Sequence, residues 1–169
     1  MLGYPTELAI TVAAPGEHLT AAPFVSRFGL PHGLAVSFCH PVVDRRGRVL
    51  VPVQAKSIDS DGELRRLGIQ IDEAAGVAKD HRRVALLIGE FADADTVDWK
   101  LGGFVPMQAG LSSRGLCEGT VAEIEEGRLA MIMRGSNHLW PDKPAYKWLS
   151  FSTDGGLSWS DAEPLPCDE

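Results

Sequence analysis

The stretch "SFSTDGGLSWSDAEPLP", close to the C-terminus, restricts the fold of this chain more than any other part of the sequence. In it Asp154 is expected to accept hydrogen bonds from backbone N–H groups of a turn, as aspartates do in Asx turns. Gly156 permits backbone angles that a Cβ would forbid, and the hydroxyls of Ser152 and Ser158 are placed to tie two strands together. Trp159 then returns an aromatic ring to the core. The stretch therefore predicts a tight hairpin pinned to a β-sheet.

Short apolar segments bounded by Gly, Asp and Asn dominate the rest of the chain. Two hairpin tips, "DRRG" and "EEG", end at Gly47 and Gly127, where a glycine suits a positive φ. No long helical periodicity is present, and "AGVAKDHRRVALL" ends in β-branched and aliphatic residues that fit a buried strand at least as well as a helix. The sequence thus predicts an all-β chain. Strands are predicted over 34–43, 48–54, 67–72, 83–91, 120–124, 128–133 and 146–152.

Length and charge set limits on the kind of protein. The 169 residues are enough for one domain with a sizeable core. The formal net charge of −7 argues against nucleic acid and against an anionic membrane as partners. No apolar run approaches the roughly 20 residues that span a bilayer. The N-terminus lacks the pattern of a signal peptide, so a soluble, cytoplasmic protein is expected if that terminus is native.

The two predicted hairpins form an internal repeat. "CHPVVDRRGRVLVPVQAKS" and "CEGTVAEIEEGRLAMIMRGS" share a cysteine, an apolar strand, a tip that runs from acidic residues to Gly-Arg, and a second apolar strand. One hairpin ends at Gln54 and the other at Arg134. The repeat is longer than a usual propeller blade of about 40–50 residues, and we place the excess in a loop-rich stretch, 89–115. Radially stacked sheets would bury both faces of such repeats, as in a β-propeller.

The spacing Ser-x-Asp-x-Gly-x-Ser-Trp matches the Asp-box (BNR repeat) of the sialidase-like propeller family. Residues 116–166 resemble one blade of that family: a glutamate, a strand, an acidic-Gly-Arg tip, a strand that ends in arginine, a variable loop, a strand and the Asp-box. "SFCHPVVDRRGRVLVPVQ" resembles the preceding blade more loosely. The resemblance implies part of a six-bladed sialidase-type β-propeller, about two to three blades. The implied divisions are an unassigned segment or partial blade at 1–33, a first blade with its loop at 34–115, and a second blade at 116–169.

The resemblance also implies an exo-α-sialidase type of site that takes an acidic sugar. In the family an arginine triad binds the substrate carboxylate, a tyrosine activated by a glutamate is the nucleophile, and an aspartate is the acid/base. Glu118 matches the glutamate, and Arg134 matches a triad arginine. Adjacent antiparallel strands would bring both residues to one rim. The alternative is a surface ion pair at the open end of a hairpin, in a non-catalytic Asp-box module that binds carbohydrate or protein.

Several members of the family's site are missing. The family's tyrosine lies in a later blade, whereas this chain has only Tyr4 and Tyr146. No arginine follows Arg134, and Arg27 lacks the pattern around the family's first arginine. The chain alone is therefore not expected to be a competent sialidase. It is expected to be completed by further blades or by a second copy in a homo-oligomer, and the third possibility is that its blades pack in an open arrangement.

Other residues are candidates for contact with a ligand. His138 and Trp140 lie in the loop after Arg134, where they could stack on sugar rings or pack the loop itself. Gln108 and Arg114 could reach the same rim from the preceding loop.

A metal site or a cofactor is not expected. Cys39 and His40, with Asp44 nearby, have no second Cys/His pair at ligand spacing, and the three cysteines suggest no disulfide framework. Cys117 is interpreted as a packing residue. The charge runs at 61–66 and 80–83 are interpreted as solvated hairpin tips.

Overall fold

The computed structural model contains two packed antiparallel sheets and a small two-stranded one. No helix occurs in the described residues, so none of sufficient length and hydropathy to cross a membrane is found there. The structure describes residues 8–10, 24–26, 35–36, 40–56, 81–93, 96–107, 111–137 and 140–165. The strands are β1 (Leu8–Ile10), β2 (Phe24–Ser26), β3 (Ala35–Val36), β4 (Val42–Val43), β5 (Val49–Lys56), β6 (Arg82–Phe91), β7 (Val97–Leu101), β8 (Leu116–Glu125), β9 (Arg128–Gly135), β10 (Lys147–Ser152) and β11 (Glu163–Pro164).

The first large sheet is a meander that runs from β3 and β4 through β5 and β6 to β7. Both β3 and β4 pair antiparallel with β5, at Ala35↔Gln54 and at Val43↔Val49, so both lie on the side of β5 away from β6. The tip between β4 and β5 closes at Gly47, whose φ is +77°. The predicted hairpin is therefore confirmed.

The second large sheet is also an antiparallel meander, in the order β11-β10-β9-β8. Its first tip closes at Gly127, with φ +73°, between strands that pair at Val121↔Met131. The predicted hairpin and the following strand β10 are confirmed. β1 and β2 pair separately, with Leu8 opposite Ser26.

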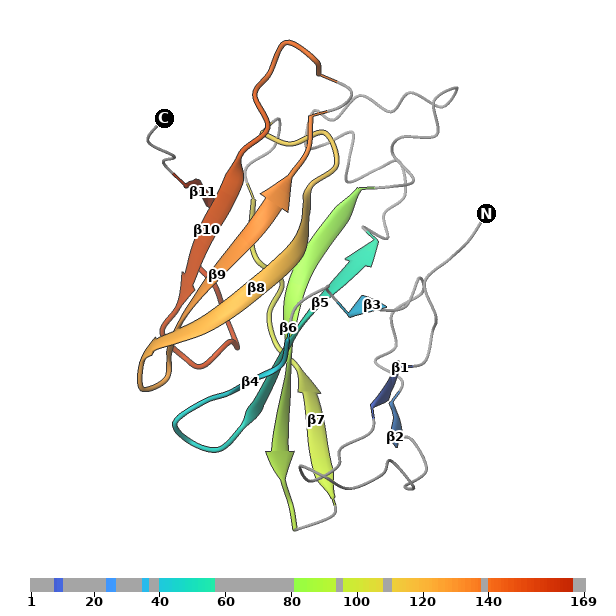
Figure 1. Cartoon of the computed structure of the whole chain (residues 1–169), viewed down its shortest axis with the longest axis vertical. Helices are drawn as coiled ribbons and strands as arrows, with labels where there is room; N and C mark the ends of the chain where they lie inside the picture. The colour runs from blue at the N-terminus through green and yellow to red at the C-terminus, as the bar shows by residue number, and fades with distance from the viewer. Residues whose placement is uncertain are drawn as a thin grey trace.

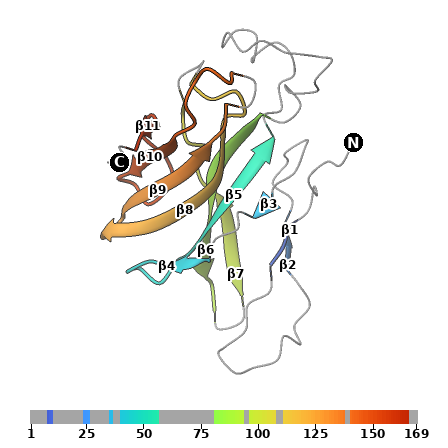
Figure 2. The same cartoon turned by 45° about the horizontal axis from the view of Figure 1, so that its top comes forward.

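The main core lies between the two large sheets (Figures 1 and 2). Alternate residues of β5 and β6 face it, as the period of two in a strand requires, and the same holds for β8, β9 and β10. The ring of Trp159 returns into this core from the Asp-box turn, as predicted. The buried members include Leu50, Val84, Leu86, Ile88, Val121, Leu129, Met131, Met133, Trp148 and Trp159. A second cluster, which includes Val51, Val53, Ala85 and Leu87, occupies the opposite face of the first sheet.

The structure adds one strand to the prediction and corrects one interpretation. The stretch 89–115, expected to be rich in loops, also contains β7, which pairs with β6. Gly89 stands opposite Trp99 there, and a Cβ on Gly89 would lie 2.8 Å from the Trp99 ring, so the glycine makes room for a large aromatic side chain. The run at 80–83 is not a solvated tip: His81 is buried and Arg82 starts β6. The predicted strand at 67–72 and the charge run at 61–66 lie outside the described residues.

Candidate functional site

The Asp-box turn joins β10 to β11 and has the hydrogen bonds that its sequence predicts. Asp154 Oδ1 accepts hydrogen bonds from Leu157 N at 3.0 Å and Ser158 N at 2.9 Å. The hydroxyl of Ser152 donates to the same carboxylate at 2.8 Å, and the hydroxyl of Ser158 donates to Oδ2. Ser152 Oγ also accepts a hydrogen bond from Gly156 N at 2.8 Å. The turn is a closed network built around one carboxylate.

This network changes the acidity of Asp154. Partial burial alone would raise the pKa of this carboxyl, but hydrogen bonds from Ser158, Ser152 and Leu157 outweigh it and lower the pKa to about 2. The ionised carboxylate is therefore the form that holds the turn together.

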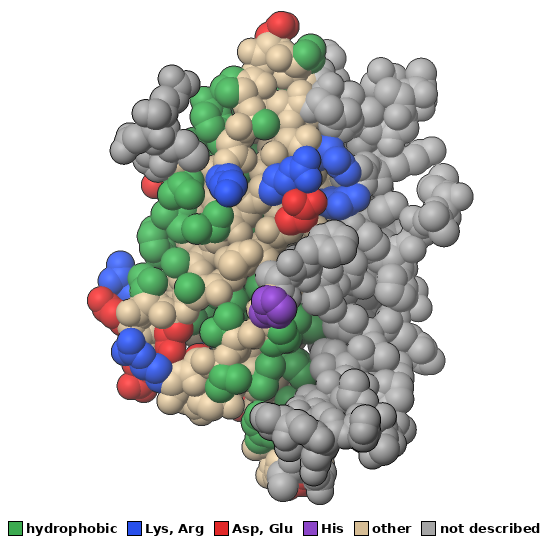
Figure 3. Space-filling model, in the orientation of Figure 1, with side chains coloured by type: hydrophobic (Ala, Val, Ile, Leu, Met, Phe, Trp, Pro, Cys, Tyr) green, Lys and Arg blue, Asp and Glu red, His purple; other side chains and the backbone are tan. Residues whose placement is uncertain are grey.

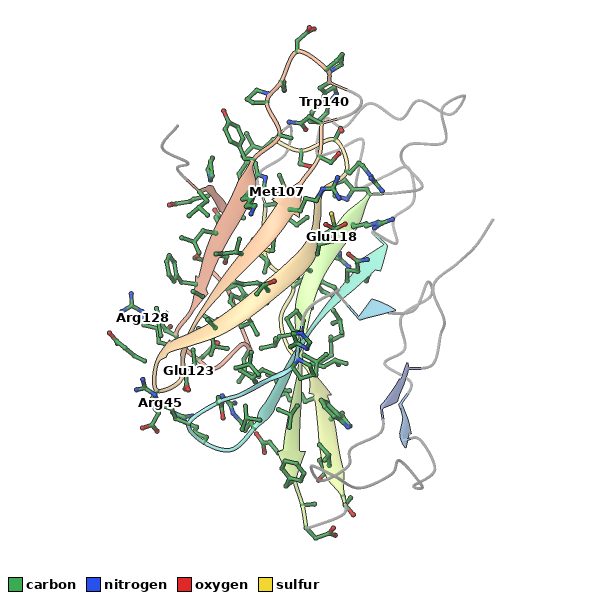
Figure 4. The ribbon with its side chains drawn as sticks, viewed as in Figure 1. Arg45, Met107, Glu118, Glu123, Arg128 and Trp140 are labelled. Atoms are coloured by element: carbon green, nitrogen blue, oxygen red, sulfur yellow. The ribbon has the colours of Figure 1, made fainter. Side chains whose placement is uncertain are left out.

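Three hairpin turns meet at this end of the molecule. Gly155 N donates to Gly127 O at 3.0 Å, which joins the Asp-box turn to the β8–β9 tip. Arg45 N, in the β4–β5 tip, donates to Glu123 Oε2 at 2.7 Å. Figure 4 labels Arg45 and Glu123 at this end and Glu118 toward the other end of β8. The Asp-box end is thus structural, and the sequence-predicted rim lies away from it.

At the other end of the hairpin, Glu118 and Arg134 lie together as expected, and they form the surface ion pair that the alternative, non-catalytic interpretation predicts. Arg134 Nη1 lies 3.0 Å from Oε1 and 3.2 Å from Oε2 of Glu118. Both side chains reach solvent, with 57% of Arg134 and 35% of Glu118 exposed. The two strands bring them together because Cys117, next to Glu118, stands opposite Arg134 in the β8–β9 register.

The backbone at Glu118 is unusual. Its φ is +52°, and of the described residues other than glycine it alone has a positive φ. The pairing of β8 with β9 shifts register between Cys117 and Thr120, so Glu118 lies in a β-bulge. Left-handed backbone is costly for a residue with a Cβ, and where it occurs it is often found at functional sites.

Two further arginines from elsewhere in the chain bring positive charge near Cys117, the neighbour of Glu118. Arg82 N, at the start of β6, donates to Arg114 O at 2.8 Å, and Arg82 forms an isolated parallel bridge with Gly115. Both arginine side chains are half-buried. We call Arg82, Arg114 and Arg134 the arginine cluster. Figure 3 shows Lys and Arg side chains gathered around an acidic side chain on this face.

The buried thiol of Cys117 responds to these charges. Burial raises its pKa, and the charge of Glu118 raises it further, while the positive charges of the arginine cluster act in the opposite direction. Cys117 Sγ also lies 3.4 Å from the carbonyl oxygen of Arg134. The residue packs under the cluster as a neutral thiol, in line with its interpretation as a packing residue.

A hydrogen-bonded turn holds Arg114 in place. Ser113 N donates to Asn137 Oδ1 at 2.9 Å, and Ser112 Oγ donates to Ser136 O at 3.1 Å. Arg114 N donates to Ser136 O at 3.2 Å. Because Ser112, Ser113 and Asn137 are buried, this turn is fixed against the end of β9 rather than free in solvent.

Other predicted contact residues have different surroundings. The Trp140 ring has Lys143 Nζ 4.5 Å from its centroid, so one face of the ring is engaged within its own loop. Tyr146 packs edge-on against Trp148 at 6.0 Å between centroids, beside β10, and β9 separates β10 from β8. Gln108, His138, Arg27 and Tyr4 lie outside the described residues.

Asp44 serves the hairpin tip. Its Oδ1 accepts hydrogen bonds from Arg46 N and Arg48 N, and its Oδ2 lies 2.7 Å from Arg48 Nε. His40 is exposed, and Cys39 is not described. Among the residues that the structure describes, no group of three His, Cys, Asp or Glu side chains could hold a metal ion.

The sequence did not identify Arg82, and it ranked Arg114 only as a weaker candidate. Both are brought near Cys117 by backbone contacts between distant segments, which local patterns do not encode. The short run Ser112-Ser113-Arg114-Gly115 was the one available signal, because serines and glycine favour a fixed turn.

No protein-family model matches the sequence, and no curated protein matches it either. The chemistry of the site therefore rests on its geometry. Guanidinium groups present planar pairs of donors that match a carboxylate, so the arginine cluster suits a small anion with a carboxylate group.

Proposed function

We propose that the chain recognises the carboxylate of an acidic sugar of the sialic acid type, at the arginine cluster. The observation that carries the proposal is that Arg134 pairs with Glu118 while the charges of Arg82 and Arg114 also act on Cys117, the residue next to Glu118. Both oxygens of Glu118 lie within 3.2 Å of one guanidinium nitrogen of Arg134, so this arginine already binds one carboxylate within the chain.

We also propose that the two large sheets are neighbouring blades of an incomplete sialidase-type propeller. From β4 to β7 and from β8 to β11, strands that are consecutive in the sequence lie next to one another. In the sequence β7, the last strand of the first sheet, is followed by β8, the first strand of the second. The Asp-box turn lies between β10 and β11. The face of the second sheet that points away from the core exposes Ile132 and Phe151, at 40% and 38%. A neighbouring blade, from a second copy, would cover this face.

The binding proposal is tested with a matched pair of ligands. Isothermal titration with the α-methyl glycoside of N-acetylneuraminic acid is compared with titration of its methyl ester, which keeps the sugar and removes the charge. The acid is expected to bind and the ester to bind at least about tenfold more weakly, because a charged hydrogen bond is lost. Equal binding of acid and ester would contradict the proposal.

Two arginines on β9 provide the matched variants. Arg134→Ala is expected to weaken binding of the acid about tenfold or more. Arg128→Ala removes an exposed arginine from the other end of the same strand, 47% exposed and paired with Glu125, and should leave affinity unchanged. Equal losses in the two variants would indicate a general charge effect.

Hydrolysis of a sialoside is the second candidate function. Glu118 is the residue that would activate a tyrosine nucleophile by taking its proton. Tyr146 packs against Trp148 instead, which favours a non-catalytic site among the residues that the structure describes. A fluorogenic sialoside decides between them: turnover that Glu118→Gln abolishes would establish the hydrolase, and binding without turnover would establish a recognition module.

A further inference from the structure

The backbone of Glu118 is held by a side chain from the other large sheet. Gln54 lies on β5, 5% exposed, and its Oε1 accepts a hydrogen bond from Glu118 N at 3.2 Å. Gln54 pairs with Val84 in the β5–β6 register, and Val84 belongs to the core between the sheets. A polar side chain in that position is costly unless it is hydrogen-bonded. The contact therefore crosses the interface between the sheets at a defined point.

Two further contacts fix the bulge around Glu118. A Cβ on Gly119 would lie 2.7 Å from Val84 Cγ1, so only a glycine lets β8 approach β6 this closely. Cys117, on the other side, lies with its sulfur 3.4 Å from Arg134 O. With the Gln54 contact, three successive residues of the bulge are each held by a neighbour. A left-handed residue persists only where its surroundings impose it.

The internal repeat gives an independent reason to connect Gln54 with the site. Gln54 follows Gly47 at the same interval as Arg134 follows Gly127, so the two residues occupy equivalent positions of the two hairpins. Both reach Glu118. Arg134 contacts its carboxylate, and Gln54 contacts its backbone N–H.

We propose that Gln54 is a positioning residue for Glu118. Its side-chain oxygen holds the Glu118 amide in the left-handed bulge, and this backbone aims the Glu118 carboxylate at Arg134. The Glu118 carboxylate in turn fixes the orientation of the Arg134 guanidinium in the arginine cluster. For its effect on a ligand this inference rests on the proposed carboxylate-binding function; for the geometry of Glu118 it does not.

The first test needs no ligand. Gln54→Leu keeps approximately the same volume and removes the acceptor. Hydrogen exchange of the Glu118 amide, measured by NMR, is expected to become about fivefold faster or more, the equivalent of one lost hydrogen bond. The other amides of β8 should keep their rates. Unchanged exchange at Glu118, or equal acceleration along all of β8, would overturn the proposal.

Val53→Ala is the matched control for stability. Val53 is the neighbour of Gln54 on β5, is fully buried, and faces the opposite cluster of the first sheet. This variant should lower the melting temperature without a selective change at the Glu118 amide. A selective change in Val53→Ala would show that any disturbance of β5 reaches Glu118, which would also overturn the specific role of Gln54.

The second test uses the α-methyl sialoside and a double-mutant cycle. Gln54→Leu is expected to weaken binding about fivefold in the wild-type background. The same substitution should have no further effect in Glu118→Gly, because that variant has neither the carboxylate nor the need for a held backbone. Additive losses would overturn the proposal. Absence of sialoside binding in the wild type would refute the proposed function alone, because the exchange measurement would still decide the role of Gln54.

Discussion

Glu118 combines an unfavourable backbone conformation with a charged side chain that reaches solvent. The backbone conformation lowers the stability of the fold, whereas the carboxylate serves the proposed site. Its positive φ costs free energy of folding for any residue with a Cβ. The ion pair with Arg134 returns little of this, because exposed pairs contribute about 0–1 kcal/mol. A purely structural role would be served better by glycine. The glutamate is therefore better explained by what its carboxylate does at the site.

Glu118→Gly tests this argument directly. The free energy of unfolding is expected to stay equal or to rise by up to about 1 kcal/mol, because the backbone strain is relieved, while sialoside binding weakens. Thr120→Gly, two positions along β8 in an ordinary extended backbone, should lower stability by about 0.5–1 kcal/mol. Urea unfolding of both variants measures the difference. A clear loss of stability in Glu118→Gly would mean that the conformation is not strained.

His81 is expected to make the stability of the fold depend on pH. Burial, followed by the positive charge of Arg83, lowers the pKa of His81 to about 4 from an ordinary value of 6.5. Between pH 4 and pH 6.5, His81 is therefore protonated in the unfolded chain and neutral in the folded chain. The contribution of the neutral His81 to the free energy of unfolding is fully present above pH 6.5. It decreases by on the order of 3 kcal/mol as the pH falls to 4.

Replacement of His81 should flatten this pH profile. In His81→Gln the free energy of unfolding is expected to vary less between pH 6.5 and 4 than in the wild type. His40→Gln, which changes an exposed histidine, should keep the wild-type slope. Chemical denaturation at a series of pH values measures both. An unchanged slope in His81→Gln would place the effect on other groups.

At the scale of elements, the three turns that meet at the Asp-box end depend on their glycines for different reasons. Gly47 and Gly155 have similar positive φ values, +77° and +72°. A Cβ on Gly47 would have no atom within 4 Å, whereas a Cβ on Gly155 would lie 2.5 Å from Arg48 Nη2. Arg48 is itself paired with the buried carboxylate of Asp44 at 2.7 Å. Gly155 is thus part of the contact between turns, and Gly47 is required only by its own turn.

Substitution of Gly47 and Gly155 by alanine separates the cost of backbone strain from the cost of a steric clash with Arg48. Gly47→Ala is expected to cost about 1 kcal/mol, from the backbone alone. Gly155→Ala should cost about 1–3 kcal/mol more, because the added methyl displaces the Arg48 guanidinium. Thermal or urea unfolding measures both values. Equal losses would show that the Asp44–Arg48 pair adapts freely to a methyl group.

The Asp-box turn has a pH window of its own. The pKa of Asp154 is lowered to about 2, so its ionised form is favoured in the folded state. The stabilisation is present above the ordinary pKa of 3.8 and is lost as the pH falls toward 2. Asp154→Asn is expected to destabilise the fold at neutral pH and to reduce the loss between pH 4 and 2. Asp161→Asn, at an exposed position in the same connection, should behave as the wild type.

The sequence could predict these elements because their determinants are local. The tips at Gly47 and Gly127, the strand β10 and the network of Asp154 all follow from residues within a few positions of one another. The Glu118–Arg134 pair followed as well, because a hairpin closed at Gly127 brings its two ends together. Arg82, Arg114 and Gln54 could not be placed in this way. Each reaches the site through packing between distant segments, and the buried His81 was misread because its neighbours are charged.

At the scale of the whole molecule, the two sheets are joined at both ends by polar contacts and in the middle by an apolar core. At the Asp-box end, Arg45 N donates to Glu123 of the second sheet, and Gly103 N, after β7, donates to Gly156 O. At the opposite end the sheets are joined by Gln54 and the Arg82–Gly115 bridge. This double attachment makes the pair of sheets a single unit with the arginine cluster at one end. The outer face of the second sheet departs from the usual pattern. An antiparallel sheet normally has polar residues on the face that solvent covers, and this face has exposed apolar side chains as well.

Solution mass tests whether a second copy covers that face. The exposed Ile132 and Phe151 are predicted to make the chain self-associate, so light scattering should give a multiple of the chain mass that increases with concentration. The double variant Ile132→Lys, Phe151→Ser should shift the mass toward the monomer, because burial of a lysine without a partner is costly. Val43→Lys changes a residue that is 66% exposed on the first sheet and should leave the mass unchanged. A wild-type monomer at every concentration would contradict completion of the ring by self-association.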